Sequence, residues 1–213
     1  MGRDRIKPND PRFKYGLPPE NNANFAWIQH YIYHLAPQGK AGFVMANGAL
    51  SAGNQEGEIR RKIIEDDLVY GIIATPPKMF YTVSLPASLW FLRKSKPEPM
   101  KGKILFIYAK KMFKSISRRQ NVFTEEHIAK IVEKFRMFEN GEPEDKINEI
   151  GFAKVATIEE VAKNGYVLTH GRYVGIKTDE EDIPFEEKMK EYSRELSELL
   201  KKEVELTEKI KEV

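Results

Sequence analysis

The chain has 213 residues, of which 41% are hydrophobic and 31% are charged, and its formal net charge is +3. This length is enough for one or two domains with a real hydrophobic core. There is no cysteine, which excludes a disulfide framework and any thiolate metal site. No run of about 18 apolar residues occurs, so we expect no transmembrane helix and a cytoplasmic location.

The charge is unevenly distributed along the chain. Residues 1–177 hold 28 Lys and Arg against 19 Asp and Glu, whereas residues 178–213 hold 7 against 13. The densest basic stretch runs from Arg93 to Arg119, where Glu98 is the only acid. A basic surface attracts a polyanion, so this stretch is either a DNA-contacting surface or a solvated loop and strand edge. The expected DNA-backbone contacts are Lys94, Lys96, Lys101, Lys103, Lys110, Lys111, Lys114, Arg118 and Arg119.

The apolar pattern of the first half predicts alternating helices and strands. Residues 24–36 have apolar side chains at helical spacing, and Pro37 ends this predicted helix. A second helix is predicted over residues 58–66. Short apolar runs predict buried strands at residues 41–46, 68–74, 87–92 and 104–108.

These elements predict an α/β fold. Strands with little polar alternation, separated by helices, are typical of a parallel or mixed sheet that is covered on both faces. No helix separates the runs 87–92 and 104–108, so we expect them to form an antiparallel edge. A complete doubly wound domain has more βα units, and we therefore expect an exposed sheet edge, or one covered by further chain or a partner. Residues 1–119 are assigned to this partial α/β domain.

Residues 120–177 are predicted to form a mixed, mostly helical region. Thr124 is a predicted helix cap, and an apolar stripe follows it at helical spacing. Residues 151–156 predict a strand, and Thr157-Ile-Glu-Glu160 has the capping-box pattern of a helix start. Residues 166–176 are interpreted as irregular or as a short hairpin.

Residues 178–213 are the clearest periodic element. Apolar residues follow a four–three spacing that Glu203 interrupts once, which predicts a long amphipathic helix with a coiled-coil-like seam. Such a helix of about 28 residues is about 40 Å long, which suits a helical partner in a subunit assembly; alternatively, it folds back on its own domain. The seam consists of Phe185, Met189, Tyr192, Leu196, Leu199, Leu206 and Ile210.

The common catalytic and nucleotide-binding patterns do not occur. His30 and His34 share a helix face, but no Glu lies between them and no third ligand follows, so we predict no metal site. The chain has no G-x-x-x-x-G-K-[ST] loop, no G-x-G-x-x-G loop and no G-x-S-x-G elbow. No role is predicted for His170, which lies beside a glycine in a loop. On motifs alone, we predict no self-contained active site.

Three separated blocks nevertheless carry a resemblance to a known family. The blocks are residues 22–48, 57–92 and 151–175. Their most informative segments are Ala46-Asn-Gly48, Gly57-Glu-Ile-Arg60, Pro77-Lys-Met-Phe-Tyr81 and Gly151-Phe-Ala-Lys-Val-Ala156. In this order the blocks resemble the methylation subunit of type I restriction–modification enzymes, which are adenine-N6 DNA methyltransferases that use S-adenosylmethionine.

The resemblance implies the C-terminal half of a Rossmann-like methyltransferase sheet, followed by a mostly helical region and the tail helix. In this family the Gly-rich donor-binding motif and the catalytic Asn-Pro-Pro-Phe/Tyr motif precede the first block. Thr75-Pro76-Pro77 looks similar to the second motif but lacks the Asn or Asp that accepts from the adenine amino group. We therefore expect this chain to be a fragment without catalytic or cofactor-binding residues, inactive alone, with S-adenosylmethionine serving the complete enzyme.

The resemblance also implies a role for Phe80. Similar adenine methyltransferases flip the target base out of the duplex and stack it on an aromatic residue before the strand that resembles residues 85–92. Phe80 occupies that place, and Tyr81 is the adjacent substitute. A flat apolar ring suits this task because it brings no competing hydrogen bond. Alternatively, Phe80 is an ordinary loop aromatic that closes the core.

The resemblance finally implies partners. In this family two methylation subunits bind one specificity subunit, which reads the DNA sequence, and helical segments mediate the assembly. We expect the seam of the tail helix to make that contact, with double-stranded DNA and a separate N-terminal half as further partners and no membrane. The expected function is the target-base side of the methyltransferase. The alternatives are a non-catalytic assembly module and the remnant of a truncated methyltransferase gene.

Overall fold

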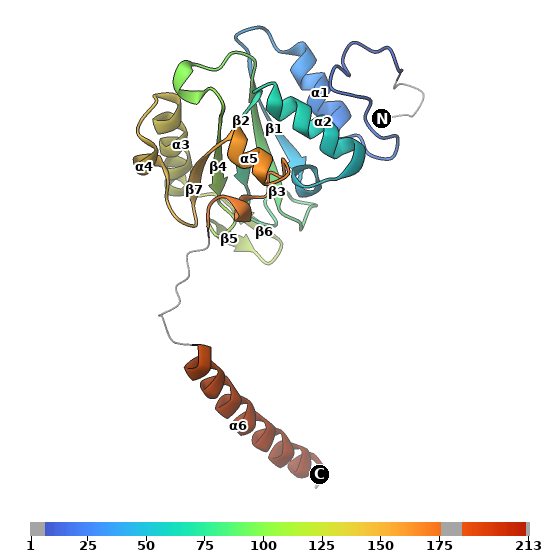
Figure 1. Ribbon diagram of the computed structural model, residues 1–213. Coiled ribbons are helices and arrows are strands. Elements are labelled where there is room, and N and C mark those ends of the chain that lie inside the picture. The colour runs from blue at the N-terminus through green and yellow to red at the C-terminus, as the bar shows by residue number, and fades with distance from the viewer. Residues whose placement is uncertain (1–6, 176–184, 212–213) are drawn as a thin grey trace. The chain divides into compact units, whose positions relative to one another are not determined.

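The structure is a computed structural model of the chain that describes residues 7–175 and 185–211 (Figure 1). Within the last helix it describes the backbone but only part of the side chains. Contacts divide the chain into two units, Met1–Ile176 and Lys177–Val213, and each is described by itself. In the described ranges, no helix combines the length and apolar character that crossing a bilayer requires.

A five-stranded mixed sheet forms the centre of the first unit, with the strand order β1-β3-β2-β4-β7. Its strands are β1 (Lys40–Ala46), β2 (Val69–Ala74), β3 (Ala87–Arg93), β4 (Lys103–Tyr108) and β7 (Ala153–Thr157). β2 and β4 are parallel, β3 is antiparallel to both β1 and β2, and β7 is antiparallel to β4. β1, β2 and β4 therefore run in one direction. We call the end of the sheet where these three strands finish its carboxyl end, and the opposite end its amino end.

The four strands predicted from apolar runs are confirmed, but one expectation about their pairing is wrong. The runs 87–92 and 104–108 do not form an antiparallel edge, because β3 lies between β1 and β2 and β4 pairs in parallel with β2. Trp90 and Leu92 of β3 are completely buried, because helices cover the face of the sheet to which they point. The antiparallel edge strand is β7 instead.

Helices cover both faces of the sheet, as Figure 1 shows. The helices on the first face are α1 (Asn24–His34), α2 (Asn54–Glu65) and α5 (Ile158–Lys163). Their apolar side chains join Trp90 and Phe106 in one buried cluster. The helices on the second face are α3 (Glu125–Glu139) and α4 (Glu144–Ile147). They bury Phe138 and Ile147 against Leu105 and its neighbours in a second cluster. The alternation of β4 side chains between the two clusters makes this a three-layer α/β unit.

Two predicted helix starts are confirmed. Thr124 Oγ1 accepts from the amide of His127 at 3.3 Å, while the ring of His127 accepts from the amide of Thr124 at 3.3 Å. Thr157 Oγ1 accepts from the amide of Glu160 at 3.2 Å and starts α5. These bonds satisfy amide groups that have no partner inside a helix.

Smaller details of the sequence-based prediction need correction. α2 begins at Asn54, earlier than the predicted start at residue 58. Of the two alternatives for residues 166–176, the structure agrees with the irregular one over residues 166–175, which contain a short 3-10 helix, η4 (His170–Arg172), and no hairpin. Two further 3-10 turns are η2 (Asn47–Leu50) and η3 (Glu98–Met100). A hairpin that the sequence does not predict lies between β4 and α3, formed by β5 (Lys114–Ser117) and β6 (Gln120–Val122).

The outer edge of β1 is unpaired in the described part of the chain. No strand among the described residues pairs with that side of β1. Val44 of this strand is 48% exposed, and Trp27 and Tyr31 of α1 are exposed nearby, with the Tyr31 ring stacked 4.5 Å from that of Phe43. An unpaired strand edge beside exposed aromatic rings is a surface that another segment of chain can cover.

The second unit contains the predicted long helix, α6 (Phe185–Lys211), which has 27 residues. Its described seam residues are all exposed: Met189, Tyr192, Leu196, Leu199 and Leu206. The side chains of Phe185 and Ile210, which also belong to the predicted seam, lie outside the described residues. The structure contains a helix at this place, and its predicted partner contact stays a prediction.

Candidate nucleic-acid interface

The loop between β2 and β3 begins and ends at the carboxyl end of the sheet. Thr75 closes its base, because its backbone amide and its hydroxyl each donate to the Ala87 carbonyl at 3.0 Å. The Ala87 amide donates back to Thr75 Oγ1 at 3.2 Å. Thr75 is buried, so the Thr75-Pro76-Pro77 segment anchors the loop. Anchoring the loop is a structural role, and it explains the Thr75-Pro76-Pro77 segment without a catalytic function.

Phe80 and Tyr81 present their rings on this loop. Phe80 is 39% exposed and Tyr81 is 86% exposed. The amide of Val83 donates to the Phe80 carbonyl at 3.1 Å and closes a tight turn that contains both residues. Phe80 is not part of either buried cluster, which disfavours the alternative that it closes the core. Exposed aromatic rings that are neighbours in sequence make this loop a candidate binding surface.

The β5–β6 hairpin is bound to this loop through Asn121, a residue that the sequence analysis missed. The Asn121 amide donates to the Lys78 carbonyl at 2.9 Å, and its side-chain Nδ2 donates to the Pro77 carbonyl at 2.9 Å. Lys78 Nζ donates in return to the Arg118 carbonyl at 2.9 Å. Asn121 is 4% exposed, so its amide bonds are protected from water. No sequence pattern signals this contact, because it joins segments 44 residues apart.

The predicted DNA-contacting stretch divides between the two ends of the sheet. One part, which we call the amino-end lysines, flanks the end of β3 and the start of β4 and consists of Lys94, Lys96, Lys101 and Lys103. The other part, the hairpin cations, follows β4 at the carboxyl end and consists of Lys110, Lys111, Lys114, Arg118 and Arg119. We call the loop between β2 and β3, which carries Phe80 and Tyr81, the aromatic loop. Of the two groups, only the hairpin cations lie at the same end of the sheet as this loop.

The environment of Lys96 contradicts its predicted role as a DNA-backbone contact. Its side chain is 2% exposed, and its Nζ donates to Asp67 Oδ1 at 2.5 Å, to the Val69 carbonyl at 2.8 Å and to the Lys103 carbonyl at 3.0 Å. Burial lowers the pKa of Lys96, and the bond to Asp67 opposes that shift. An ammonium that is buried with three acceptors cannot reach a phosphate.

The other amino-end lysines also hold internal bonds. Lys94 Nζ donates to the Leu35 carbonyl, and Lys101 pairs with Glu98. Lys103 Nζ lies 2.9 Å from Glu144 Oε1. These three side chains are partly or largely exposed, so they remain able to exchange partners, but each already has an acceptor.

The hairpin cations differ from the amino-end lysines in their carboxylate partners and in their exposure. Among the described residues, none of them forms an ion pair with a carboxylate. All except the half-buried Lys110 are exposed, and the apolar side chains of Phe113 and Ile116 are exposed between them. Cations without a carboxylate partner are free to replace the counterions of a phosphate backbone. The structure thus joins an exposed aromatic loop and an unpaired basic hairpin at one end of the sheet.

A cavity of about 430 Å³ opens at the same end. We call it the carboxyl-end cavity, and its polar lining residues are Asn47, Ser51, Lys110, Thr169 and His170. His170 is 2% exposed, its Nε2 lies 3.1 Å from the Ile72 carbonyl oxygen, and its ring meets that of Phe106 edge-on. Burial lowers the pKa of His170 to about 4, so the ring is neutral at neutral pH.

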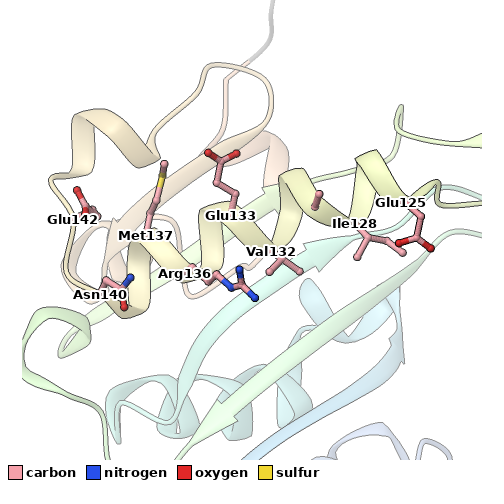
Figure 2. A pocket seen from close by; sticks show the side chains of 9 residues that line it. Glu125, Ile128, Val132, Glu133, Arg136, Met137, Asn140 and Glu142 are labelled. Atoms are coloured by element: carbon pink, nitrogen blue, oxygen red, sulfur yellow. The ribbon is translucent and has the colours of Figure 1, made fainter.

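A second hollow, of about 460 Å³, follows the outer side of α3, where Figure 2 shows its lining side chains. Ile128 and Val132 are exposed there at helical spacing. Glu125, Glu133 and Glu142 also line this hollow. Because these acids repel a polyanion, we do not include the hollow in the nucleic-acid interface.

His30 and His34 are neighbours on one face of α1. Their ring centroids lie 4.2 Å apart on α1, and Arg12 Nη1 lies 3.5 Å from His30 Nδ1. Within the part of the chain that the structure describes, no group of three or more His, Cys, Asp and Glu side chains is arranged to hold a metal ion.

Comparison with known proteins identifies the class to which this fold and surface belong. Residues 3–182 match the family model described as N-6 DNA Methylase, and the chain belongs to that family. It is 69% identical to the type I restriction enzyme MjaIX methylase subunit of Methanocaldococcus jannaschii over 99% of this chain and 38% of that relative. It is 43% identical to the HindI methylase subunit of Haemophilus influenzae over 95% of this chain and 45% of that relative. The resemblance to type I methylation subunits is confirmed, and the chain spans less than half the length of these two relatives.

Solved structures agree with this assignment. The type I restriction-modification methyltransferase subunit of Streptococcus thermophilus matches 78% of this chain and 34% of that chain, with 32% identity and a TM-score of 0.68. The M protein of the type I restriction enzyme EcoKI matches with 20% identity and a TM-score of 0.58, which supports the fold alone. The mixed α/β unit is therefore a methyltransferase-like fold of the kind found in type I methylation subunits.

Family membership implies S-adenosylmethionine as methyl donor, and the carboxyl-end cavity does not fit it. The donor carries a sulfonium and an ammonium against one carboxylate, so its net charge is positive. Among the described residues, Lys110 is the only charged side chain that lines the cavity, and no carboxylate faces it there. Like charges at short range repel, which disfavours the donor in this cavity. We therefore assign no donor-binding residue among the described residues.

Proposed function

We propose that this chain forms the target-base side of an S-adenosylmethionine-dependent adenine-N6 DNA methyltransferase of the type I methylation-subunit class. The observation that carries this proposal is the juxtaposition of Phe80 and the hairpin cations, which Asn121 ties together. Cations that contact phosphates fix the register of a protein on the duplex. The exposed ring of Phe80 beside them supports stacking on a base that leaves the duplex.

In this proposal, Phe80 stacks on the extruded adenine and Tyr81 is the neighbouring aromatic. Flipping a base out of the duplex costs a few kcal/mol, and stacking on an aromatic ring contributes about 1–3 kcal/mol per base. Phe80 thus offsets a large part of the cost. Lys111, Lys114 and Arg118 contact the phosphates, with Arg119 and Lys110 at the ends of the same surface.

The donor-binding and catalytic parts are proposed to lie in sequence beyond these 213 residues. The chain spans 38% of the 69%-identical relative, which leaves most of that protein to supply them. The unpaired outer edge of β1, with Trp27 and Tyr31 exposed beside it, supports a sheet that another segment extends. By itself, the chain then neither binds S-adenosylmethionine nor transfers a methyl group.

We further propose that α6 contacts the specificity subunit and a second methylation subunit. Its described seam residues are exposed over much of a 27-residue helix, and a helix of this kind gains stability by packing its apolar stripe on another helix. Leu199→Glu is expected to abolish co-purification with a specificity subunit of the same type I system. Lys201→Gln changes the charge equally outside the seam and is expected to leave co-purification intact.

Complementation tests the main proposal. This chain is co-expressed with the part of the Methanocaldococcus jannaschii relative that it does not span, and transfer of labelled methyl groups to unmethylated DNA is measured. We expect N6-methyladenine from the two parts together and none from either part alone. Methylation by this chain alone, or micromolar binding of S-adenosylmethionine to it, contradicts the proposal.

The exposed seam of α6 favours one alternative function, a non-catalytic assembly module. Stable co-purification with the specificity subunit, combined with no methylation in the complementation experiment, supports this alternative. Loss of both properties supports the third candidate, the remnant of a truncated methyltransferase gene.

A further inference from the structure

We propose that the hollow along α3 is the docking surface for a basic amphipathic helix of a partner protein. We call it the α3 hollow, and its volume is about 460 Å³. Figure 2 shows its lining side chains distributed along the helix, from Glu125 in the first turn to Glu142 beyond the last. None of the residues proposed to contact DNA lines this hollow, so the inference does not rest on the proposed function.

The helix α3 has apolar side chains on two sides. On its inner side Ile131 and Phe138 are buried in the second cluster against the sheet. On its outer side Ile128 is 43% exposed and Val132 is 36% exposed, and Met137 also lines the hollow. A helix on the surface of a domain needs only one apolar side to pack on that domain. The outer side is therefore apolar surface that a further element can cover.

The spacing of the outer side chains favours a helix as that element. Ile128 and Val132 are four residues apart, so they lie one above the other on the same face. α3 has 15 residues and is about 22 Å long at about 1.5 Å per residue. Ridges of side chains on one helix pack into the grooves of another, and recognition of a helix in a groove uses anchors at this spacing. A partner helix of about four turns covers the α3 hollow.

The charge of the α3 hollow selects a basic partner. Its lining contains three carboxylates, those of Glu125, Glu133 and Glu142, against the single guanidinium of Arg136. Glu142 pairs with Lys146 at 3.2 Å, whereas Glu125 and Glu133 form no ion pair among the described residues.

This acidic surface is an exception within a basic part of the chain. Residues 1–177 hold 28 Lys and Arg against 19 Asp and Glu. The body as a whole therefore repels a basic segment, while the α3 hollow attracts one. Complementary charge across an interface gives specificity, and the apolar floor of the hollow supplies affinity. Arg136 accommodates one acid in an otherwise basic partner helix.

The same charges disfavour other occupants. DNA and acidic segments are repelled by Glu125 and Glu133. The helix α6, of this chain or of a second copy, has 7 Lys and Arg against 8 Glu, so it brings no positive charge that complements the hollow. A helix with an apolar stripe bordered by Lys or Arg satisfies both the floor and the acids.

Two synthetic helical peptides of about 16 residues, or about four turns, test the inference with the 213-residue chain. They share one leucine stripe, and their polar faces consist of Lys in one peptide and Glu in the other. We expect saturable binding of the lysine peptide in calorimetry, with amide chemical-shift changes centred on Ile128 and Val132. The glutamate peptide should bind at least about tenfold more weakly. No saturable binding, equal binding of both peptides, or shift changes centred outside the α3 hollow contradicts the inference.

Variants at exposed positions assign the charge contact. Glu133→Lys is expected to lower the affinity for the lysine peptide by about tenfold. Glu195→Lys makes the same change at an exposed position of α6 and is expected to bind as the wild type does. Unchanged affinity in Glu133→Lys refutes the charge assignment.

A second pair of variants assigns the apolar contact. Ile128→Asp is expected to abolish binding of the lysine peptide, whereas Ile150→Asp, at a position that is 70% exposed and outside the hollow, should retain it. Thermal unfolding verifies that each variant folds. If Ile128→Asp does not fold, Glu133→Lys still decides.

Sedimentation of the chain without peptide tests a second copy as the occupant. We expect the oligomeric state to be the same for the wild type and for Val132→Asp. A dimer that Val132→Asp dissociates identifies a second copy on the α3 hollow and contradicts the inference. The inference and the proposed function fail independently, because complementation measures methyl transfer and the peptides measure docking at α3.

Discussion

The amino-end lysines and the hairpin cations come from one basic stretch of the sequence, but they have opposite environments. Every amino-end lysine has an acceptor within the protein, and Lys96 is buried with three. The hairpin cations have no carboxylate partner among the described residues. A count of positive charges therefore overstates the surface that is free to contact DNA. What separates the two groups is which end of the sheet they occupy.

The largest expected effect is on DNA affinity when the hairpin cations are all changed to Gln in the complemented enzyme. We expect affinity to fall by about a hundredfold in about 0.15 M salt, because each neutralised phosphate releases counterions. The slope of log K against log salt concentration should become shallower by about 0.9 for each phosphate that the variant no longer neutralises. A variant with only Lys111, Lys114 and Arg118 changed to Gln removes three charges, and its matched control changes Lys94, Lys101 and Lys103 to Gln. Equal reductions of affinity in these two matched variants contradict the division of the basic stretch.

The second effect is on stability. Lys96→Met keeps the length of the side chain but removes the donor from Asp67 and from two carbonyls, one of them that of Val69. We expect the free energy of unfolding to fall on the order of 3 kcal/mol. Lys114→Met, at an exposed hairpin position, should change it by less than about 0.5 kcal/mol. Urea denaturation measures both, and similar values for the two variants speak against a buried structural role of Lys96.

The third effect is a pH dependence of the free energy of unfolding, which comes from His170 at the carboxyl end of the sheet. Its pKa falls from an ordinary 6.5 to about 4 in the folded chain, so the unfolded chain binds the proton more tightly. Stability is therefore complete above pH 6.5 and is lost as the pH falls toward 4. The upper limit is about 3 kcal/mol, at 1.36 kcal/mol per pKa unit. His170→Gln should flatten the stability profile over that range, and an unchanged profile contradicts the assignment.

The smallest expected effect is on stability when the exposed ion pair between Lys101 and Glu98 is removed. The side chains of Lys101 and Glu98 are 56% and 83% exposed, and exposed ion pairs contribute little because water and salt screen them. Lys101→Ala should lower the free energy of unfolding by less than about 0.5 kcal/mol. A decrease above about 1 kcal/mol shows that even exposed members of the amino-end group are structural.

The strands were predictable because burial on both faces leaves a run of apolar residues that is visible in one dimension. Their order was not, because an apolar run carries no information on direction or neighbours, and β3 was misplaced for that reason. The family resemblance pointed to Phe80, whereas nothing in the sequence pointed to Asn121 or to the cavity role of His170. Both depend on contacts between distant segments, 44 residues apart for Asn121 and 98 for His170.

The most direct test of the account replaces Phe80 in the complemented enzyme and measures methyl transfer to unmethylated DNA together with DNA affinity. The account predicts that Phe80→Ala lowers kcat/KM by at least about tenfold, since stacking contributes about 1–3 kcal/mol per base. Phe80→Trp should keep most of the rate, and DNA affinity should stay nearly constant because the hairpin cations supply it. Unchanged methyl transfer by Phe80→Ala contradicts a base-stacking role and leaves the aromatic loop without a function.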